Sequence, residues 1–340
     1  MVERTLLQER LIAIIRRFPQ RKMLVVGDAI ADQFVYGAIA RVSREAPVFI
    51  LRHECTETIP GGAANCAVNL SALGAGVSLI CVVGADEAGR ALVEKLNNAG
   101  IDCGGIVISE KVRTTTKVRI LAGQTHSTRQ QVIRLDYEGN DSGDGSLSDQ
   151  LRKQVLEKTG SVDAVIISDY NYGVANPEMA IFTRDAALAR KLPTLVDSRF
   201  RLGSLPGFTS ATPNGDEVEQ LLGADVTDIA QLEVAAEDLR KRLGHRALLL
   251  TRGSQGMLLL EAGVPPMHIN AVGGREPVDV TGAGDTVIAT YALALASEAS
   301  FPDAARLANY AGGLVVMKRG TASVTAQELE YSVLHSELVP

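Results

Sequence analysis

The sequence predicts an α/β fold in three layers, α/β/α, in which helices cover both faces of a mostly parallel sheet, with a small second β-sheet beside it. Two observations lead to this prediction. Short, almost continuously apolar runs alternate with helical patterns along most of the chain, as in parallel sheets buried on both faces. Two other regions alternate polar and apolar residues without helices between them. With 340 residues, 46% of them hydrophobic, the chain can bury a large core.

The elements follow one another in a regular order. Residues 1–20 are expected to form a surface helix, because apolar residues recur at helical spacing and charged residues interrupt any signal-peptide core. Apolar strands and helices then alternate, with strands predicted at 23–28, 77–84, 163–170, 194–198, 246–252 and 255–262, and helices at 88–100 and 177–191. The regions without helices, about 33–53 and 114–136, are predicted to form a β lid inserted into one domain spanning 1–340. Exposed lid strands would favour edge-to-edge pairing in a homodimer.

Charge and cysteine usage exclude several classes of protein. The formal net charge is −6 and no block of five like charges occurs, which argues against a nucleic-acid partner or a polybasic membrane anchor. The longest apolar run, residues 286–297, is too short to span a bilayer. The four cysteines stand singly, without a C-x-x-C motif, so we expect reduced, mostly buried thiols and a cytoplasmic protein.

Residues 279–285 read Asp-Val-Thr-Gly-Ala-Gly-Asp and lead into an apolar helix. Gly282, Ala283 and Gly284 lack bulk, so the unpaired N–H groups of the first helical turn could surround an anion. Asp285 would repel a phosphate that is merely bound, but its carboxylate could take a proton from a hydroxyl that attacks phosphorus. The alternative is that Asp285 is a first-turn acid and the glycines form a turn.

Polar residues at the ends of other predicted elements form further candidate sites. Asn65 follows Gly61 and Gly62 in the first turn of a helix, where it could bond a ligand hydroxyl or cap the helix. Asp28 and Asp32 lie just past the carboxyl edge of the first strand, the edge at which α/β sheets bind ligands. Two carboxylates there suit a polyhydroxyl compound, although either could be a turn or cap residue.

Two more segments suit a nucleotide and its metal ion. Asn214 and Glu217 stand three residues apart at a helix start, which fits a water-shelled Mg²⁺ but also a capping box. Residues 251–256 form a predicted glycine turn between strands that could border a nucleotide. A G-x-x-x-x-G-K-[ST] motif does not occur, which excludes a P-loop kinase.

The segments at 61–65, 214–217 and 279–285 occur in the order and rough spacing of one family. Together they resemble the ribokinase-like (phosphofructokinase B) carbohydrate kinases, over nearly the whole chain after the N-terminal helix. The resemblance implies a ribokinase-like fold with a β-sheet lid, and ATP and Mg²⁺ as cofactors. It also implies an anion hole at 282–284 and Asp285 as the catalytic base.

The same resemblance implies roles for individual residues. It places the sugar at Asp32, Gly61, Gly62 and Asn65, and Asp28 is a further substrate-binding candidate from its position at the strand edge. Contacts with the nucleotide and the Mg²⁺–phosphate region are expected at Asn214, Gly215, Asp216, Glu217, Thr251, Gly253, Gly256 and Asn309. A monovalent cation such as K⁺, used by many members, would involve Asp279, Thr281 and Ser323.

Within the family, segments 27–37, 41–48, 115–121, 130–138 and 168–173 are most similar to the bacterial D-glycero-β-D-manno-heptose 7-phosphate kinases. This resemblance implies transfer of the ATP γ-phosphoryl group to the anomeric hydroxyl of heptose 7-phosphate, giving the 1,7-bisphosphate toward ADP-heptose and lipopolysaccharide core. A substrate phosphate on the lid side needs cations, and arginine suits bidentate phosphate contact. The candidates are Arg41, Arg119, Arg134 and Arg199.

Two departures from the heptose kinase pattern bear on the substrate. Tyr172 stands where those kinases usually have lysine in S-D-Y-x-K-G, and residues 197–199 read Asp-Ser-Arg instead of Asp-Pro-Lys. A kinase of another sugar or sugar phosphate, such as ribose or a fructose phosphate, is therefore the alternative. A non-catalytic sugar-phosphate sensor is the alternative of a different class. The nucleotidyltransferase domain that often follows such a kinase is expected to be absent, because the chain ends at residue 340.

Overall fold

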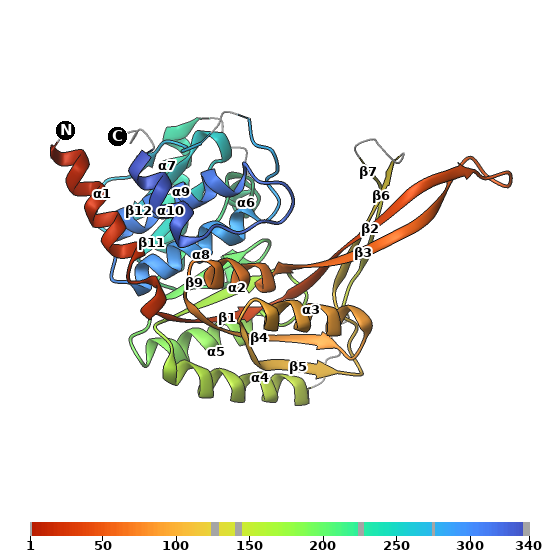
Figure 1. The fold of residues 1–340 in the computed structure, drawn as a ribbon. Helices are drawn as coiled ribbons and strands as arrows, with labels where there is room; N and C mark the ends of the chain where they lie inside the picture. The colour runs from red at the N-terminus through yellow and green to blue at the C-terminus, as the bar shows by residue number, and fades with distance from the viewer. Residues whose placement is uncertain (1, 124–128, 140–144, 224–227, 274–275, 336–340) are drawn as a thin grey trace.

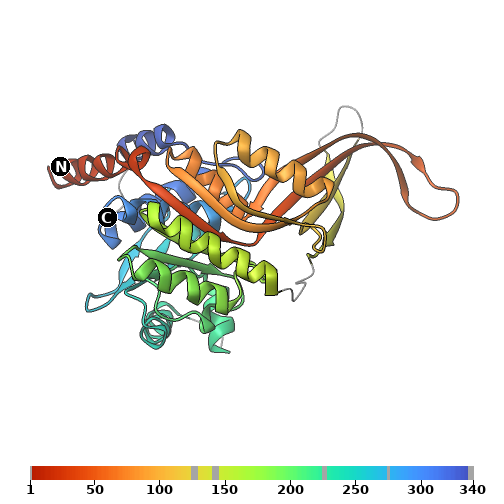
Figure 2. The same cartoon turned by 90° about the horizontal axis from the view of Figure 1, so that it is seen from below.

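The structure of the protein is a computed structural model, drawn in two views in Figures 1 and 2. It describes residues 2–123, 129–139, 145–223, 228–273 and 276–335. Residues 124–128 of the predicted lid lie outside the described residues.

Within the described residues, a nine-stranded sheet forms the middle layer, in the order β13-β12-β11-β10-β9-β8-β1-β4-β5. The strands are β1 (Lys22–Gly27), β4 (Gly76–Gly84), β5 (Asp102–Ser109), β8 (Ala164–Asp169), β9 (Thr194–Ser198), β10 (Ser210–Ala211), β11 (Ala247–Thr251), β12 (Met257–Glu261) and β13 (Met267–Ile269). Neighbouring strands from β11 to β5 run parallel. The pairs β11–β12 and β12–β13 are antiparallel.

Helices cover both faces of this sheet and create two apolar cores. Along β1, Met23 and Val25 point into one core and Leu24 and Val26 into the other, as successive side chains of a strand do. The first core is covered by α1 (Val2–Ile15), α2 (Ala63–Ala72), α3 (Glu87–Asn98), α8 (Ala283–Ala296), α9 (Phe301–Val315) and α10 (Ala326–His335). The second is covered by α4 (Gly145–Lys158), α5 (Pro177–Leu188), α6 (Gly215–Leu222) and α7 (Ile229–Leu243). The predicted three-layer α/β fold is confirmed.

A second sheet, of four strands in the described part of the chain, stands apart and forms the lid. Its strands are β2 (Ala29–Val42), β3 (Phe49–Gly62), β6 (Thr116–Gly123) and β7 (Gln130–Tyr137), in the order β3-β2-β6-β7. The β2–β3 hairpin projects well beyond the rest of the molecule in both views (Figures 1 and 2). The two regions predicted to lack helices thus form this sheet, although β2 begins earlier and β3 ends later than predicted.

Several strands differ from the sequence prediction. The runs at 246–252 and 255–262 form an antiparallel pair, β11 and β12, on either side of the predicted glycine turn, within a mostly parallel sheet. The alternation of apolar runs does not reveal β5, which contains a glycine pair, or β10 and β13, which have two and three residues. Such short or glycine-containing segments carry too little periodicity to be recognised.

Two expectations from composition can be compared with the described residues. None of the helices there combines the length and the apolar character that crossing a bilayer requires. All four cysteines are free thiols; Cys66 and Cys81 are buried, Cys103 is half-buried and Cys55 is exposed.

The carboxyl edge of β1 is where the chain leaves the central sheet for the lid, and the backbone is closely packed there. A Cβ on Gly27 would lie 2.1 Å from the carbonyl oxygen of Ser168 on β8. Where β3 returns from the lid, Gly62 has a φ of 58°, and a Cβ there would lie 2.5 Å from the carbonyl oxygen of Asp28. Glycines therefore allow β1, β8 and the lid to meet at this edge.

Candidate active site

The start of α8 leaves its first-turn N–H groups uncapped. Gly282 adopts a left-handed φ of 75°, and no side chain caps the helix. A Cβ on Gly282 would lie 2.6 Å from Asn65 Nδ2, whereas a Cβ on Gly284 would meet no atom within 4 Å. Position 282 must therefore be glycine, because its φ is left-handed and because a side chain there would collide with Asn65. The open space at Gly284 would let a ligand approach the N–H groups.

Asp285 lies in the first turn of α8 and is only 3% exposed. Its Oδ2 accepts a hydrogen bond from Asn65 Nδ2 at 2.7 Å, and its Oδ1 accepts one from the Tyr170 hydroxyl at 2.9 Å. Burial raises the pKa of Asp285 to about 6; the two hydrogen bonds oppose this rise, and the charge of Asp32 adds to it. A carboxylate with a pKa near neutrality is suited to take up and release a proton.

A buried amide network holds Asn65 in one orientation. Thr286 Oγ1 donates to Asn69 Oδ1 at 2.8 Å, and Asn69 Nδ2 donates to Asn65 Oδ1 at 3.2 Å. Because the Asn65 oxygen accepts that bond, its NH₂ group points at Asp285. The alternative interpretation of Asn65 as a helix cap is wrong, since the N-cap of α2 is Gly62 and no side chain caps it.

A turn after β8 brings Tyr170 to Asp285. The buried carboxylate of Asp28 accepts hydrogen bonds from the backbone N–H groups of Tyr170, Tyr172 and Val174, at 2.9, 3.0 and 2.9 Å. These bonds engage both Asp28 oxygens. The predicted contact of Asp28 with substrate is therefore unsupported, and its carboxylate holds the turn instead.

Asp32 lies on β2 and is buried beside Gly61 of β3. A Cβ on Gly61 would lie 2.4 Å from Asp32 Oδ2, so this position must be glycine for the carboxylate to lie there. Asp32 Oδ1 forms an ion pair with Nη1 of Arg119 on β6 at 2.5 Å. Asp32 is also close enough to raise the pKa of Asp285, so the predicted sugar contacts Asp32, Gly61 and Asn65 gather around that residue.

One face of the lid carries charged side chains. In the strand register, Asp32 lies opposite Lys117, Lys117 opposite Asp136, and Arg119 opposite Arg134. Lys117 Nζ lies 3.1 Å from Asp136 Oδ2, and Arg134 donates to the two Asp136 oxygens at 2.7 and 2.6 Å. The bonds from Arg134, and then from Lys117, lower the pKa of Asp136 to about 2. This face carries three cationic side chains (Lys117, Arg119 and Arg134) and two acidic ones (Asp32 and Asp136). Its net charge is therefore positive, and we call it the cationic lid face.

Lys117 also links the lid to the turn after β8. Its Nζ donates to the Tyr172 hydroxyl at 2.9 Å and lies 5.3 Å from the centre of the Tyr172 ring. Tyr172, one of the two departures from the heptose kinase pattern, is therefore hydrogen-bonded to the ammonium group of a lid lysine.

Arg41 and Arg199 lie away from the cationic lid face. Arg41 is exposed near the tip of the β2–β3 hairpin, opposite Ile50, and about 30 Å from Asp32 at the usual rise per strand residue. It therefore does not join the other cations within a single chain. Arg199 is exposed after β9, and its charge favours the ionised form of Glu217.

Tyr170 and Lys117 are site residues that sequence reasoning misses. Both lie in segments that resemble the heptose kinases, 168–173 and 115–121, so a polar side chain inside a matched segment is the available signal. Which of these side chains reaches Asp285 or the lid face depends on the shape of a turn and on strand register. Neither can be derived from the local sequence.

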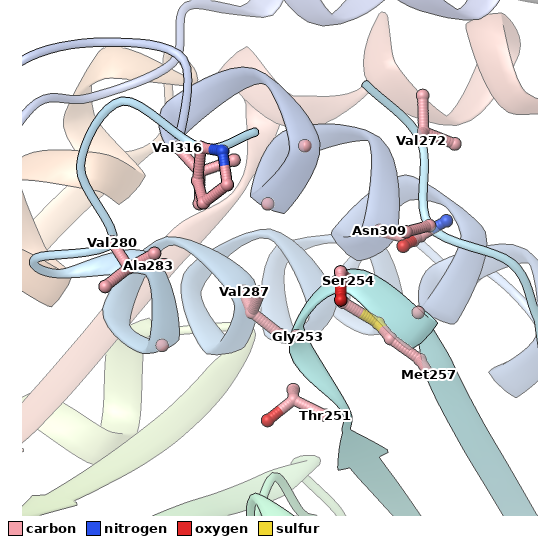
Figure 3. A pocket seen from close by; sticks show the side chains of 16 residues that line it. Thr251, Gly253, Ser254, Met257, Val272, Val280, Ala283, Val287, Asn309 and Val316 are labelled. Atoms are coloured by element: carbon pink, nitrogen blue, oxygen red, sulfur yellow. The ribbon is translucent and has the colours of Figure 1, made fainter. Parts of the chain in front are cut away.

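A largely apolar cavity of about 220 Å³ opens beside the start of α8. Its walls come from the turn after β11, residues 271–272, α8 and α9; Figure 3 shows Thr251 and Ser254 near the turn and Asn309 on α9. The predicted nucleotide contacts that line it are Thr251, Gly253, Gly256 and Asn309. Ala283 and Gly284 line it as well, so the cavity reaches the uncapped N–H groups.

The predicted Mg²⁺ segment lies beside this cavity, since Asn214 forms a β-bridge with Thr251. Asn214 Oδ1 accepts from the Glu217 N–H at 2.9 Å, and Glu217 Oε2 accepts from the Asn214 N–H at 3.0 Å. The capping-box interpretation is therefore confirmed, with Gly215 and Asp216 in the first turn of α6. One Glu217 oxygen takes part in the box, so the second oxygen is the one that a hydrated ion would use.

A magnesium ion would need ligands from outside the protein. Within the described part of the chain, no group of three His, Cys, Asp or Glu side chains could hold a metal ion. Mg²⁺ commonly takes one or two carboxylates and completes its shell with water and phosphate oxygens. Glu217 fits that limited role.

Of the residues predicted to bind a monovalent cation, Ser323 has a lysine ammonium group beside it. The Asp279 carboxylate accepts from the N–H groups of Thr281 and Gly320 at 2.9 and 3.0 Å, which joins the loop before α8 to the loop after α9. The Ser323 carbonyl oxygen accepts from Lys318 Nζ at 2.7 Å. A potassium ion on that oxygen would lie beside the ammonium group, and like charges repel. Ser323 is therefore a poor ligand for the predicted ion.

The assembled site can be compared with known proteins. The model of the pfkB family of carbohydrate kinases matches residues 20–328. The chain belongs to this family. It is therefore an ATP-dependent sugar kinase, and the family prediction from residues 61–65, 214–217 and 279–285 is confirmed.

Curated relatives are similar over most of this chain. Bifunctional protein HldE of Caulobacter vibrioides is 41% identical over 317 residues, and that of Pseudomonas aeruginosa is 40% identical over 318. The alignments cover 92% and 93% of this chain and 64% of each relative. The chain thus spans less than two thirds of the length of these relatives.

Solved structures share the fold at low sequence identity. Escherichia coli phosphofructokinase-2 in complex with potassium has a TM-score of 0.75 and 19% identity, covering 93% of this chain and 98% of that one. Arabidopsis thaliana ribokinase complexed with ribose and ATP has a TM-score of 0.71 and 20% identity, covering 92% and 98%. These likenesses confirm the ribokinase-like fold.

We expect Asp285→Asn to remove a pH-dependent loss of stability from the protein. The pKa of Asp285 in the folded state, about 6, is above the value of 3.8 for a free aspartate. Stability therefore falls as the pH rises from about 4 to about 6, because the unfolded chain ionises there and the folded chain does not. Asparagine does not ionise, so the variant lacks this loss of unfolding free energy, which is up to about 3 kcal/mol. Urea unfolding of both proteins at about pH 4 and about pH 8 measures the effect, and equal pH dependence would contradict it.

Proposed function

We propose that this kinase transfers the γ-phosphoryl group of ATP to the anomeric hydroxyl of D-glycero-β-D-manno-heptose 7-phosphate, giving the 1,7-bisphosphate. The observation that carries the proposal is the position of Asp285, which is buried at the uncapped start of α8 and close to Asp32 of the lid. The matched segments in the lid and the turn after β8 support the choice of sugar. The 41% identity to a protein named HldE supports it further.

Asp285 would act as the general base. Each of its oxygens accepts one fixed hydrogen bond and keeps a lone pair for the acceptor hydroxyl. The hydroxyl oxygen would form a bond to the γ-phosphorus as its proton passes to Asp285 and the bond from phosphorus to the ADP oxygen breaks. The N–H groups around residues 282–284 would stabilise the charge on the transferred group.

ATP would lie with its base in the cavity and its phosphates toward residues 282–284. The apolar walls suit a nucleobase, and Thr251 and Asn309 add polar groups. The Asn309 side chain is oriented, because its Nδ2 donates to the carbonyl oxygen of Asn270 at 2.7 Å. Mg²⁺ would be held through water near Glu217, where it would neutralise phosphate charge.

The sugar phosphate would lie beneath the lid. Asp32 and Asn65 are placed to contact hydroxyl groups near Asp285. The 7-phosphate would extend toward Lys117, Arg119 and Arg134 on the cationic lid face. Arg41 would not contact the sugar phosphate bound to the same chain, because it lies near the tip of the β2–β3 hairpin.

A different phosphorylated sugar, such as a fructose phosphate, is the second candidate. The observation that favours it is Tyr172, which replaces the usual lysine and binds Lys117. Ribose has no phosphate, so it would not use the excess positive charge of the cationic lid face. A non-catalytic sensor would gain nothing from a buried carboxylate with a pKa of about 6 beside an anion site.

Asp285→Asn should reduce kcat by a factor of about 10² to 10⁴, because the variant lacks the base. Binding of ATP and of the sugar phosphate should change only a few-fold, since the amide keeps the shape of the carboxylate. Release of ADP gives the turnover, and calorimetry gives both affinities. A variant that keeps most of its turnover would show that Asp285 is not the base.

Lys117→Ala and Arg134→Ala should each raise KM for the heptose 7-phosphate about tenfold or more and leave KM for ATP unchanged. The reason is the loss of a charge-assisted contact with the phosphate. Arg152→Ala, at an arginine of α4 paired with Glu178, is the matched control. Kinetics with heptose 7-phosphate and with unphosphorylated heptose separate the effects, and equal losses on both sugars would remove these cations from the phosphate site.

We also propose that the kinase works in the cytoplasm as a homodimer. Val118, Ile120, Ile133 and Leu135 alternate with the charged residues of β6 and β7, so they form the opposite face of the lid. Ile133 and Leu135 are 53% and 47% exposed. Exposed apolar faces mark interaction surfaces, and the same face of a second copy would cover this one, instead of the predicted edge-to-edge pairing.

The double variant Ile133→Glu, Leu135→Glu should be monomeric at concentrations where the parent is a dimer, because charges would be buried at the interface. Light scattering after gel filtration gives both masses. Ile108→Glu changes an equally exposed apolar residue on β5 and should remain dimeric. A monomeric parent, or a dimeric double variant, would refute this interface.

A further inference from the structure

We propose that Tyr170 is a positioning residue for phosphoryl transfer, whose hydroxyl orients the Asp285 carboxylate and favours its ionised form. The inference deepens the proposed function and rests on the role of Asp285 as base. Tyr170 lies outside residues 61–65, 214–217 and 279–285, the motifs that identify the family.

Two donors from different elements hold the carboxylate. Tyr170, from the turn after β8, donates to Oδ1 at 2.9 Å, and Asn65, from α2, donates to Oδ2 at 2.7 Å. The terminal torsion of an aspartate is soft, so a carboxylate held at one oxygen can rotate about the bond that carries it. Donors at both oxygens define its plane, and therefore the direction of its remaining lone pairs.

The other titratable side chains that interact with Asp285 are acidic, and the charge of Asp32 raises its pKa. Asp32 of β2 and Asp197 of β9 are acids that interact with it, and Cys66 of α2 is a buried thiol. The guanidinium of Arg119 is paired with Asp32. The ionised form is therefore favoured by the two neutral donors, together with the N-terminal end of α8.

Tyr170 itself remains a neutral donor. Burial, and then the charge of Asp285, raises the pKa of the Tyr170 hydroxyl well above its usual value. A phenol that keeps its proton at physiological pH can supply the hydrogen bond throughout the reaction.

The turn that carries Tyr170 is anchored on both sides. Asp28 accepts three backbone N–H groups of the turn, as described above. Asp169 accepts from the Asn171 N–H at 2.9 Å, and its own oxygens are bound by Ser198 and Arg201. Asn171 has a left-handed φ of 66°, which turns the chain sharply after Tyr170. Two buried carboxylates thus fix the position from which Tyr170 reaches Asp285.

Tyr170→Phe should move the acid limb of the kcat/KM profile upward by about one pH unit, because the ionised base loses one donor. At alkaline pH, kcat/KM should stay within a few-fold of the parent. The assay uses the full chain and the sugar that gives the parent its highest turnover. Replacing Tyr170 by 3-fluorotyrosine, whose more acidic phenol is a stronger donor, should move the same limb downward.

Tyr291→Phe is the matched control, since it removes another buried tyrosine hydroxyl, which is hydrogen-bonded from α8 to Ser210 of β10. It should lower stability without moving the acid limb. An unmoved limb in both Tyr170 variants would overturn the inference, as would a loss that is equal at every pH. A different result would contradict the proposed function itself: an Asp285→Asn variant that keeps most of its turnover.

Discussion

The burial of one carboxylate at the uncapped start of a helix is the constraint on which the rest of the site depends. Asp285 loses its water, and nearby acids add to the cost of its charge. Asn65 and Tyr170 offset part of that cost by donating to its two oxygens. Each donor is in turn held by residues with no apparent chemical role: Asn69 orients Asn65, while Asp28 holds the turn of Tyr170. Much of the buried polar network therefore serves to aim one side chain.

The glycines around the site have a second function besides leaving room for a phosphate. An added Cβ at Gly282 would collide with the Asn65 amide. One at Gly61 would collide with the Asp32 carboxylate, and one at Gly62 with the Asp28 carbonyl oxygen. These glycines therefore let polar groups lie directly against the backbone, and a side chain at any of them would displace a group that the site uses. Gly284 differs, because the space beside it is open to a ligand.

The lid is a sheet with two unlike faces, which follows from the period of two along its strands. One face presents Lys117, Arg119 and Arg134, and the other presents apolar side chains such as Ile133 and Leu135. The proposed substrate site and the proposed dimer interface would therefore lie on opposite faces of the same strands. A one-residue slip in register would exchange the two faces, so both proposals depend on the same strand pairing.

The sequence by itself determined the fold class, the two-part division into layers and lid, and the family, because these depend on periodic patterns and short glycine motifs. It also pointed to Asp285, because Gly282, Ala283 and Gly284 directly precede it in the same motif. Only the tertiary structure decided that Asp28 holds a turn, that Arg41 is remote, and that Tyr170 and Lys117 belong to the site. Those contacts join residues far apart in the chain, through the geometry of a turn and the register of a sheet, and local sequence does not encode either.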